Sequence, residues 1–506
     1  MKHILENKVY VYLIILFLGL LTSFSLPPYN FYFLNFITLP MLIYILIFYT
    51  SGKSNFFLVG WIFGFGYFIS SLYWIINSLT FDESFKFIIP FALILIPAFL
   101  GLFYGLSFFL LSLFHLRKKI STILIFSIIF ATIEFLRSFI FGGFPWNLII
   151  FSLSNNLPSI QILSNIGTYS LNLLAITIFS FPIIIFFQYR KLVKFLLLAF
   201  GITLVLINIE YGKYNLKKFE KKNYENLNLV IRVISPKIPI ERFLANRDPE
   251  KSIQELIKLS NPDSSQETIF IFPEGVITSI YLHDLKAFKK LFKENYNINH
   301  KIILGINDVR DDKILNSLVV IDNKGDLLFK YNKNKLVPFG EFIPFERFFR
   351  KIGLKKVTQG YKSFSPDNKR EILNITNLKF MPLICYEIIY SGRINLHKED
   401  YNFVLNISED GWFGKSVGIY QHFSHSIFRS IEEGKNIIRS SNNGISAFIS
   451  PKGQVIRKIE NIGYIDLNKF KRVDKTYFSK NGNKIFFYFV LFYTTLIVIL
   501  KNRESK

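Results

Sequence analysis

The chain has 506 residues, of which 51% are hydrophobic, and 58 of them are phenylalanine. This composition is too apolar for an ordinary soluble domain, so it excludes a protein that is soluble throughout. The formal net charge of +24 is compatible with nucleic-acid binding, but no motif for that function accompanies it, and lysine, asparagine, isoleucine and phenylalanine are frequent along the whole chain. We therefore expect no nucleic-acid partner.

Eight apolar stretches predict transmembrane helices. They cover residues 9–26, 31–50, 56–79, 87–114, 120–141, 166–188, 195–209 and 485–500. Because a helix needs about 20 residues to cross the hydrocarbon core, the seventh and eighth stretches are short and would need flanking polar residues and tyrosines at the interfaces. The first stretch lacks a small-residue cleavage site, so we expect it to be retained. We predict seven helices within residues 1–215 and one over 484–501.

The short loops predict how these helices are oriented. Lysine and arginine precede the first stretch and follow the second, fourth and sixth, whereas the alternate loops carry almost no positive charge. Because positively charged short loops stay on the cytoplasmic side, we expect both termini in the cytoplasm. The long segment between the seventh and eighth helices is then outside, and its own lysines do not contradict this, because long loops translocate largely regardless of charge.

Residues 222–480 form this outside segment, which we predict to be a separate domain. Apolar runs typical of strands cover 227–233, 268–272, 301–306, 317–322, 327–331, 380–386, 403–408 and 445–450. Apolar residues with helical spacing cover 249–259, 282–294 and 425–440. Strands that alternate with helices predict a layered α/β domain in which helices pack over the sheets.

Three of the predicted strands end at reactive side chains. Glu274 follows TIFIFP, Lys333 lies in FKYNKNKLVPFGE, and Cys385 ends FMPLIC. Each has an ordinary structural interpretation: a helix cap, a solvated loop residue and a small apolar core residue. Together they supply what acyl transfer through a thiol requires, namely a base, a cation near the developing oxyanion and a nucleophile. Cys385 is the only cysteine, so it has no disulfide partner within the chain.

Several motifs around these residues resemble the nitrilase superfamily. They are FPEG, KYNKNKLVPFGEFIP, LICYE, NISEDGWFG and RSSNNGISAFISPKG. In the membrane part, GWIFGFGYFISSLYWI at 60–75, IEFLRSFIFGGFPWN at 133–147 and the single helix after the domain are similar to apolipoprotein N-acyltransferases of bacterial inner membranes. The resemblance covers nearly the whole chain. It implies an αββα sandwich for the outside domain, next to the polytopic α-helical membrane domain.

The resemblance implies a catalytic set of glutamate, lysine and cysteine. Cys385 matches the nucleophile, Glu274 the general base and Lys333 the oxyanion partner. Lys335 competes with Lys333, because residues two apart on a strand face the same way. The family spacing before LVPFGE selects Lys333. Glu341 in PFGE matches a second glutamate that supports the lysine.

Residues beside the nucleophile and in a glycine turn are further candidates. The backbone amide of Tyr386 would help to stabilise the oxyanion. Glu387 matches a family position, although a carboxylate at the start of a helix is an equally good interpretation. Trp412 and Phe413 in DGWFG could shape a lipid entrance, with packing inside the turn as the alternative.

Within the membrane part, Glu134 and Arg137 lie three residues apart on one helical face. Charges in lipid pair with each other or face an internal cavity, so we predict either a structural ion pair or a headgroup contact for Arg137. Trp146, in the predicted helix break GFPWN, is a candidate interface anchor. The segment IRVISPKIPIERF at 231–243 departs from the NIPQ and tryptophan pattern of the family, which argues against lipid contacts from this loop.

The resemblance implies an N-acyltransferase with ping-pong kinetics. A fatty acyl group would pass from a phospholipid, with phosphatidylethanolamine as the implied donor, through a thioester on Cys385 to the N-terminal amine of a diacylglyceryl-cysteine lipoprotein. Both substrates stay in the bilayer, because exposing an acyl chain costs about 0.8 kcal/mol per methylene. We expect a monomeric, multi-pass enzyme of the bacterial inner membrane with a periplasmic catalytic domain, no cofactor and no metal site.

Three alternatives remain open. A membrane-tethered carbon-nitrogen hydrolase of the amidase or nitrilase type would use the same three residues but resolve the thioester with water. A transporter with an extracellular binding domain would tolerate replacement of Cys385 by serine. A Cys-His hydrolase would use His422 or His425 as its base in place of Glu274.

Overall fold

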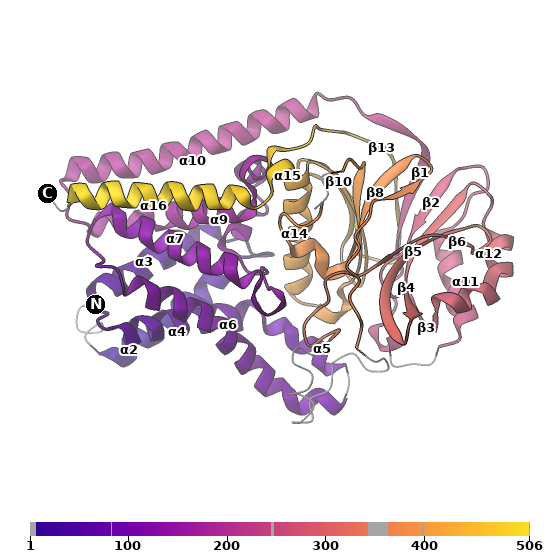
Figure 1. Cartoon of the computed structure of the whole chain (residues 1–506), viewed down its shortest axis with the longest axis horizontal. Coiled ribbons are helices and arrows are strands. Elements are labelled where there is room, and N and C mark those ends of the chain that lie inside the picture. Colours follow the sequence, from indigo (N-terminus) through magenta and orange to yellow (C-terminus); the bar gives the residue numbers. More distant parts are fainter. Residues whose placement is uncertain (1–6, 82, 244–246, 343–362, 396–398, 505–506) are drawn as a thin grey trace. The chain divides into compact units, whose positions relative to one another are not determined.

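The structure is a computed structural model that describes residues 7–81, 83–243, 247–342, 363–395 and 399–504. It divides into two compact units. The first consists of Met1–Ile76, Lys86–Glu220 and Thr476–Lys506, and the second consists of Asn77–Phe85 and Lys221–Lys475. The first unit is helical, and the strands of the described residues all belong to the second unit (Figure 1).

Within the described residues, six helices are long and apolar enough to cross a membrane. They are α4 (Lys53–Ser71), α6 (Ile89–Leu111), α7 (Ile120–Arg137), α9 (Leu163–Ser180), α10 (Lys191–Glu220) and α16 (Lys484–Glu504). Two further apolar helices are shorter, α2 (Lys8–Ser23) and α3 (Asn35–Phe48). All eight apolar stretches therefore form helices. The two shorter helices are the first and the second, whereas the sequence predicted that the seventh and eighth would be short.

The length of α10 differs most from the sequence prediction. The apolar run was expected to end at residue 209, but the helix continues to Glu220 and has 30 residues. Lysine and glutamate are good helix formers, so Lys213 and Lys217 do not end the helix. The end of an apolar run marks a change of environment, and it need not mark the end of a helix.

Residues 77–79, predicted as the end of the third membrane helix, belong instead to the second unit, where they form α5 (Asn77–Thr80). The Asn77 side chain donates a hydrogen bond of 2.6 Å to the carbonyl of Phe413. Phe81 packs edge-on against Trp412 with a distance of 5.5 Å between ring centroids. These contacts join the segment to residues far along the chain, and apolar periodicity does not reveal them.

The second unit contains two β-sheets. One has seven strands in the order β13-β1-β2-β4-β5-β6, with β3 paired to β4, and the other has six in the order β12-β11-β10-β9-β8-β7. The strands of the first sheet are β1 (Glu225–Ser235), β2 (Thr268–Ile271), β3 (Ile277–Tyr281), β4 (His300–Arg310), β5 (Lys313–Asp322), β6 (Leu327–Asn332) and β13 (Gly463–Phe470). The strands of the second are β7 (Leu373–Ile375), β8 (Leu378–Ile384), β9 (Phe403–Glu409), β10 (Asn436–Asn442), β11 (Ser446–Ile449) and β12 (Val455–Ile459).

Apolar residues from both sheets form a shared core. Ile231, Val233 and Leu318 of the first sheet belong to one buried cluster with Phe380 and Phe448 of the second. The helices α11 (Pro249–Ser260) and α12 (Lys289–Asn295) pack on the other face of the first sheet, in a second buried cluster. Helix α14 (Gly418–Glu433) covers the second sheet (Figure 1). The predicted αββα sandwich is confirmed.

One predicted helix is wrong in its second half. We predicted a helix over 425–440, but α14 ends at Glu433 and residues Asn436–Asn442 form β10. Gly434 ends the helix in a left-handed conformation with a φ of 63°, which glycine adopts without steric cost. The β-branched residues Ile437 and Ile438 then favour the strand.

Candidate active site

Cys385 lies at a strained turn directly after β8. Its φ is 51°, a left-handed conformation that a non-glycine residue keeps only where the surrounding structure holds it. The turn begins a short 3₁₀ helix over Cys385–Ile389, and the side-chain amide of Asn406 on β9 donates to the Cys385 carbonyl at 3.4 Å. A sharp turn after a strand presents a nucleophile and frees the backbone amides beside it. Only 8% of the cysteine surface is exposed.

The Glu274 carboxylate is fixed by donors from two other strands. Its Oε1 accepts a hydrogen bond of 2.7 Å from Asn316 Nδ2 on β5. Its Oε2 accepts one of 2.9 Å from the backbone amide of Glu409 at the end of β9, which belongs to the other sheet. Strand β4 passes so close that a Cβ on Gly305 would lie 2.6 Å from the Glu274 Cα, so only glycine fits there. Glu274 therefore sits where the ends of the two sheets meet.

Lys333 bridges two carboxylates. Its Nζ lies 3.2 Å from Glu274 Oε1 and 2.9 Å from Glu341 Oε1, and its side chain is 1% exposed. Burial works against the ammonium, but the charges of Glu274 and Glu341 outweigh it and raise the pKa of Lys333 well above its ordinary value. Lys333 therefore carries a fixed positive charge at any physiological pH.

The thiol of Cys385 lies in the electrostatic field of the same pair. Burial and then the charge of Glu274 raise the pKa of Cys385 well above its ordinary value, while the charge of Lys333 acts in the opposite direction. At neutral pH the resting side chain is thus a protonated thiol, which is a poor nucleophile. Nucleophilic attack by this sulfur therefore requires a base. Of the charged groups around the thiol, Glu274 has the largest effect on its pKa. The structure brings Glu274, Lys333 and Cys385 together.

The two lysines that compete in the sequence have different environments. Lys335 contributes its backbone amide to Glu387 at 3.1 Å. Burial and then the charges of Arg393 and Arg370 lower the pKa of its side chain. Of the two lysines, it is Lys333 that contacts the carboxylates of the site. The geometry selects Lys333, where strand alternation leaves the choice open.

Asn316 is a site residue that the sequence analysis missed. Its Nδ2 donates to both carboxylates, at 2.7 Å to Glu274 and 3.1 Å to Glu341, and its carbonyl accepts from the Lys333 amide at 2.8 Å. The amide of Val337 fixes Glu341 a second time, at 2.8 Å from Oε2. Nothing in the sequence around Asn316 marks this role, because the role depends on the pairing of β5 with β6.

Glu387 ties the loop of Lys333 to the turn of Cys385, and it is 1% exposed. Its hydrogen-bond donors are the backbone amides of Asn334 at 2.9 Å, Lys335 at 3.1 Å and Ile384 at 2.8 Å, the Tyr331 hydroxyl at 2.8 Å and Arg370 Nη2 at 2.7 Å. The same carboxylate thus makes the helix-start contact and supports the lysine loop. The helix-start interpretation matches the contact with the Ile384 amide, and a role of Glu387 in catalysis stays a prediction.

Glu387→Gln is expected to lower both stability and acyl transfer. A neutral amide cannot accept all of these hydrogen bonds and turns an N–H toward other donors, which costs about 1–3 kcal/mol in a buried site. Acyl transfer should fall about 10- to 100-fold as the two loops shift. Glu433→Gln is the matched control, because that carboxyl is also buried and burial raises its pKa to about 7. Equal losses in both variants, in thermal unfolding and in transfer assays, would rule out a special role for Glu387.

A buried polar network next to the Cys385 turn contains the histidine considered as an alternative base. Arg439 Nη2 donates to the two oxygens of Asp410 at 2.9 and 2.7 Å, and His422 Nδ1 lies 3.0 Å from Asp410 Oδ1. Burial and then the charge of Arg439 lower the pKa of His422, which hydrogen-bonds the backbone of Cys385. These contacts indicate that His422 stabilises the turn at Cys385. His425 is also fully buried.

The aromatic residues near the site are engaged in packing. Trp412 stacks on Phe243 with 5.2 Å between ring centroids. Phe413 is 9% exposed and packs edge-on against His422 at 5.4 Å. Tyr386 is 6% exposed, and its backbone amide directly follows the nucleophile. Contact of Trp412 and Phe413 with lipid stays a prediction.

In the helical unit, Arg137 and Trp146 lie at the break that follows α7. Arg137 is 1% exposed and lies 3.8 Å from Glu134, as an ion pair requires. It also donates to the carbonyls of Phe144 at 2.6 Å and Asn147 at 3.3 Å. Trp146 is 3% exposed. The contacts of Arg137 fit the structural alternative, and the lipid contacts of both residues stay predictions.

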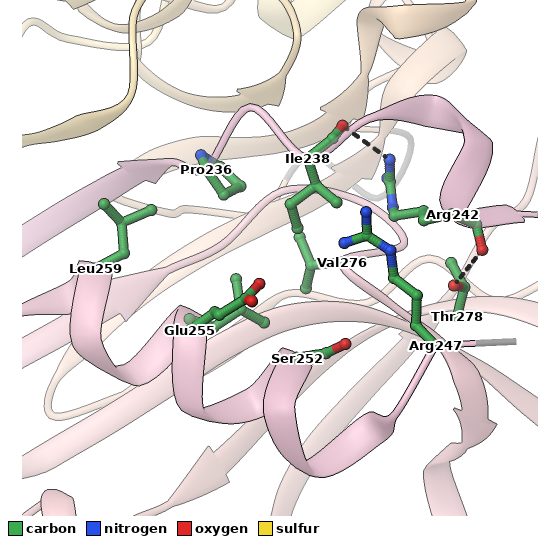
Figure 2. A pocket seen from close by; sticks show the side chains of 10 residues that line it. Pro236, Ile238, Arg242, Arg247, Ser252, Glu255, Leu259, Val276 and Thr278 are labelled. Carbon is green, nitrogen blue, oxygen red and sulfur yellow. Dashed lines mark hydrogen bonds between the residues drawn. The ribbon is translucent and has the colours of Figure 1, made fainter. Parts of the chain in front are cut away.

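A small recess of about 70 Å³ lies beside Val276 and Thr278 (Figure 2). Its lining includes Arg242, Arg247, Ser252, Glu255, Val276 and Thr278. None of Glu274, Lys333 and Cys385 belongs to this lining, so the recess is separate from the candidate active site. Across the part of the chain that the structure describes, no three histidine, cysteine or acidic side chains are grouped as a metal site requires.

Comparisons with known proteins give two family models and a set of related sequences. Residues 18–181 match the model of the apolipoprotein N-acyltransferase N-terminal domain, and residues 246–464 match that of carbon-nitrogen hydrolase. Apolipoprotein N-acyltransferase from Rickettsia bellii is 33% identical over 457 residues, which cover 88% of this chain and 89% of the relative. The same enzyme from Rhizobium rhizogenes is 29% identical over 493 residues, or 91% of each chain. A crystal structure of a CN-hydrolase superfamily protein from Xanthomonas campestris is 14% identical, covers 49% of this chain and 91% of its own, and has a TM-score of 0.34.

Proposed function

The chain belongs to the apolipoprotein N-acyltransferase family, and on that premise we propose that Cys385, Glu274 and Lys333 carry out acyl transfer from a phospholipid to a lipoprotein. One observation supports this most strongly. The Lys333 ammonium is held 3.2 Å from Glu274 and 2.9 Å from Glu341, and it interacts electrostatically with the Cys385 thiol. A base, a cation and a nucleophile at one site are what thioester chemistry needs.

In the first half-reaction, Glu274 takes the proton of Cys385, and the thiolate attacks the carbonyl carbon of a phospholipid acyl ester. Lys333 Nζ and the backbone amide of Tyr386 stabilise the tetrahedral oxyanion. The ester C–O bond then breaks, and the leaving alkoxide takes the proton back from Glu274. A lysophospholipid departs, and a thioester remains on Cys385.

In the second half-reaction, the α-amine of a diacylglyceryl cysteine at the N-terminus of a lipoprotein attacks the thioester. Glu274 accepts a proton from the attacking amine and passes it to the leaving sulfur of Cys385, so that an amide forms and the thiol is restored. Two successive substrates at one cysteine give ping-pong kinetics. Phosphatidylethanolamine is the proposed acyl donor, and the enzyme acts as a monomer.

We further propose that the catalytic domain, residues 222–480, is periplasmic, and that both termini lie in the cytoplasm. Seven helices within 1–215 and one over 484–501 would hold it at the inner membrane. The positive charges in alternate short loops support this orientation. The acyl chains of both substrates support attachment of the domain to the membrane, because removing them from the bilayer costs about 0.8 kcal/mol per methylene.

Transfer of a labelled acyl chain from phospholipid to a diacylated lipopeptide tests this function against the hydrolase alternative. We expect the label on the lipopeptide as an amide that resists hydroxylamine, together with one lysophospholipid per transfer. A membrane-tethered carbon-nitrogen hydrolase would release labelled free fatty acid at the same rate with and without the lipopeptide. That outcome would contradict the proposal.

A further inference from the structure

Arg242 belongs to the segment 231–243, where the chain departs from the family pattern, and its side chain is 1% exposed. Its Nη1 donates to the carbonyls of Ile238 and Pro239, both at 3.3 Å, and Figure 2 shows the contact with Ile238. The carbonyl of Arg242 accepts a hydrogen bond of 3.0 Å from Thr278 Oγ1. A buried guanidinium with this many donors in use holds segments of the chain together.

The remaining donors of Arg242 bind two groups next to Glu274, the carbonyl of Gly275 and the carboxylate of Glu409. Its Nε donates to the carbonyl of Gly275, the residue that follows Glu274, at 2.9 Å. Its Nη2 forms an ion pair with the carboxylate of Glu409, and the backbone amide of Glu409 donates to Glu274 Oε2 at 2.9 Å. One guanidinium therefore fixes the residue after Glu274 and also the residue that holds a carboxylate oxygen of Glu274.

We propose that Arg242 is a positioning residue that orients the Glu274 carboxylate by clamping Gly275 and Glu409. The inference rests on the proposed function, because it takes Glu274 to be the general base. It gives the loop that departs from the family pattern a part in catalysis that needs no contact with lipid or with the reacting atoms.

The ion pair also neutralises a carboxylate close to the base. Glu409 is 1% exposed, and Asn442 Nδ2 and the amide of Gly411 each donate to it at 2.7 Å. Without Arg242, Glu409 would be an unpaired buried charge next to Glu274, and such charges are strongly unfavourable. With Arg242 in place, the side chain of Glu409 is paired while its backbone amide binds Glu274.

Lysine cannot replace this clamp. A guanidinium presents five donors in a rigid planar fork, whereas an ammonium is a point charge on a flexible stem. Arg242→Lys therefore keeps a positive charge near Glu409 but cannot bind Gly275, Ile238 and Glu409 at the same time. The substitution therefore removes the hydrogen bonds that orient Glu274 but keeps the positive charge that balances Glu409.

The experiment compares Arg242→Lys in two backgrounds of the full-length enzyme, by following acylation of Cys385 in phospholipid micelles with mass spectrometry over minutes to days. In the parent we expect the substitution to slow acylation about 10- to 100-fold, because a misplacement of about 1 Å has a cost of that size. In a Glu274→Gln background we expect a further loss of less than about twofold, because the group that Arg242 orients is already absent. This lack of additivity is a result that general destabilisation would not produce.

Arg232→Lys is the matched control. Arg232 is also buried, pairs with Asp466 at 2.8 Å, and donates to the carbonyls of Ser260 at 2.9 Å and Asn261 at 2.6 Å. Its described contacts do not include the candidate catalytic residues. We expect Arg232→Lys to lower the Tm about as much as Arg242→Lys and to leave the acylation rate unchanged. If Arg242→Lys does not fold, Glu409→Gln takes its place in the same comparison, with the same lack of additivity expected.

Equal slowing by Arg242→Lys in both backgrounds would overturn the inference, because the effect would then not pass through Glu274. Equal slowing by Arg242→Lys and Arg232→Lys at equal loss of Tm would also overturn it, because stability alone would explain both. A Glu274→Gln enzyme that acylates at the parent rate is a separate result, which would refute the proposed function and remove the premise.

Discussion

Cys385→Ser is expected to abolish acyl transfer, with a fall in rate of about 10⁴-fold or more. A serine hydroxyl ionises less readily than a thiol and is a weaker nucleophile, and the single carboxylate of Glu274 cannot make up the difference. The measurement is the formation of labelled lipopeptide and lysophospholipid by the variant in detergent micelles. Neither product should exceed the level of a reaction without enzyme.

The control for this variant is its stability. Serine differs from cysteine in one atom, and the turn at Cys385 is held by backbone contacts such as the one from Asn406, so the Tm should stay close to that of the parent. Unchanged function in Cys385→Ser is what a transporter with an extracellular binding domain would show. That result would contradict the account.

Glu274→Gln is expected to have opposite effects on two reactions of the same sulfur. Acyl transfer should fall about 10²- to 10⁴-fold, because the proton acceptor is lost. Alkylation of Cys385 by iodoacetamide should become faster at a given pH. Burial still raises the pKa of the thiol in the variant, but the negative charge of Glu274 no longer adds to the shift and the positive charge of Lys333 remains.

The pH dependence of alkylation follows from the direction of this shift. A raised pKa keeps the thiol protonated at neutral pH, so alkylation of the parent should increase as the pH rises above neutrality. In Glu274→Gln the same increase should occur at lower pH. Glu255→Gln on α11 is an exposed control and should change neither alkylation nor transfer. Parallel losses of both reactions in Glu274→Gln would indicate a collapsed site and not a missing base.

The three candidate catalytic residues could be predicted because each follows an apolar run. TIFIF and FMPLI are typical of buried strands, whereas LLFKY forms the edge strand β6, in which Leu327, Leu328 and Phe329 are exposed. The candidate residues lie just after these three runs. Pattern alone could not separate Lys333 from Lys335, because residues two apart share a strand face. Contact with Glu274 and Glu341 makes the distinction in the structure.

The supporting residues could not be predicted in the same way, because they act through contacts between distant segments. Asn316 lies inside β5 and Arg242 lies in the short 3₁₀ helix Ile240–Phe243, and neither position carries a local signal. The helix predicted over 425–440 failed for a related reason. Apolar spacing in a short run fits a helix or a strand, and here Gly434 and the pairing of β10 with β9 decide for the strand.

The central claim is that Cys385 carries a fatty acyl group between the two substrates. Mass spectrometry of the intact enzyme after incubation with phospholipid tests this most directly. The account predicts a mass increase of one fatty acyl group that proteolysis maps to Cys385 and that either hydroxylamine or a diacylated lipopeptide removes. An unmodified Cys385 in an enzyme that demonstrably transfers acyl chains, or an adduct on another residue, would contradict it.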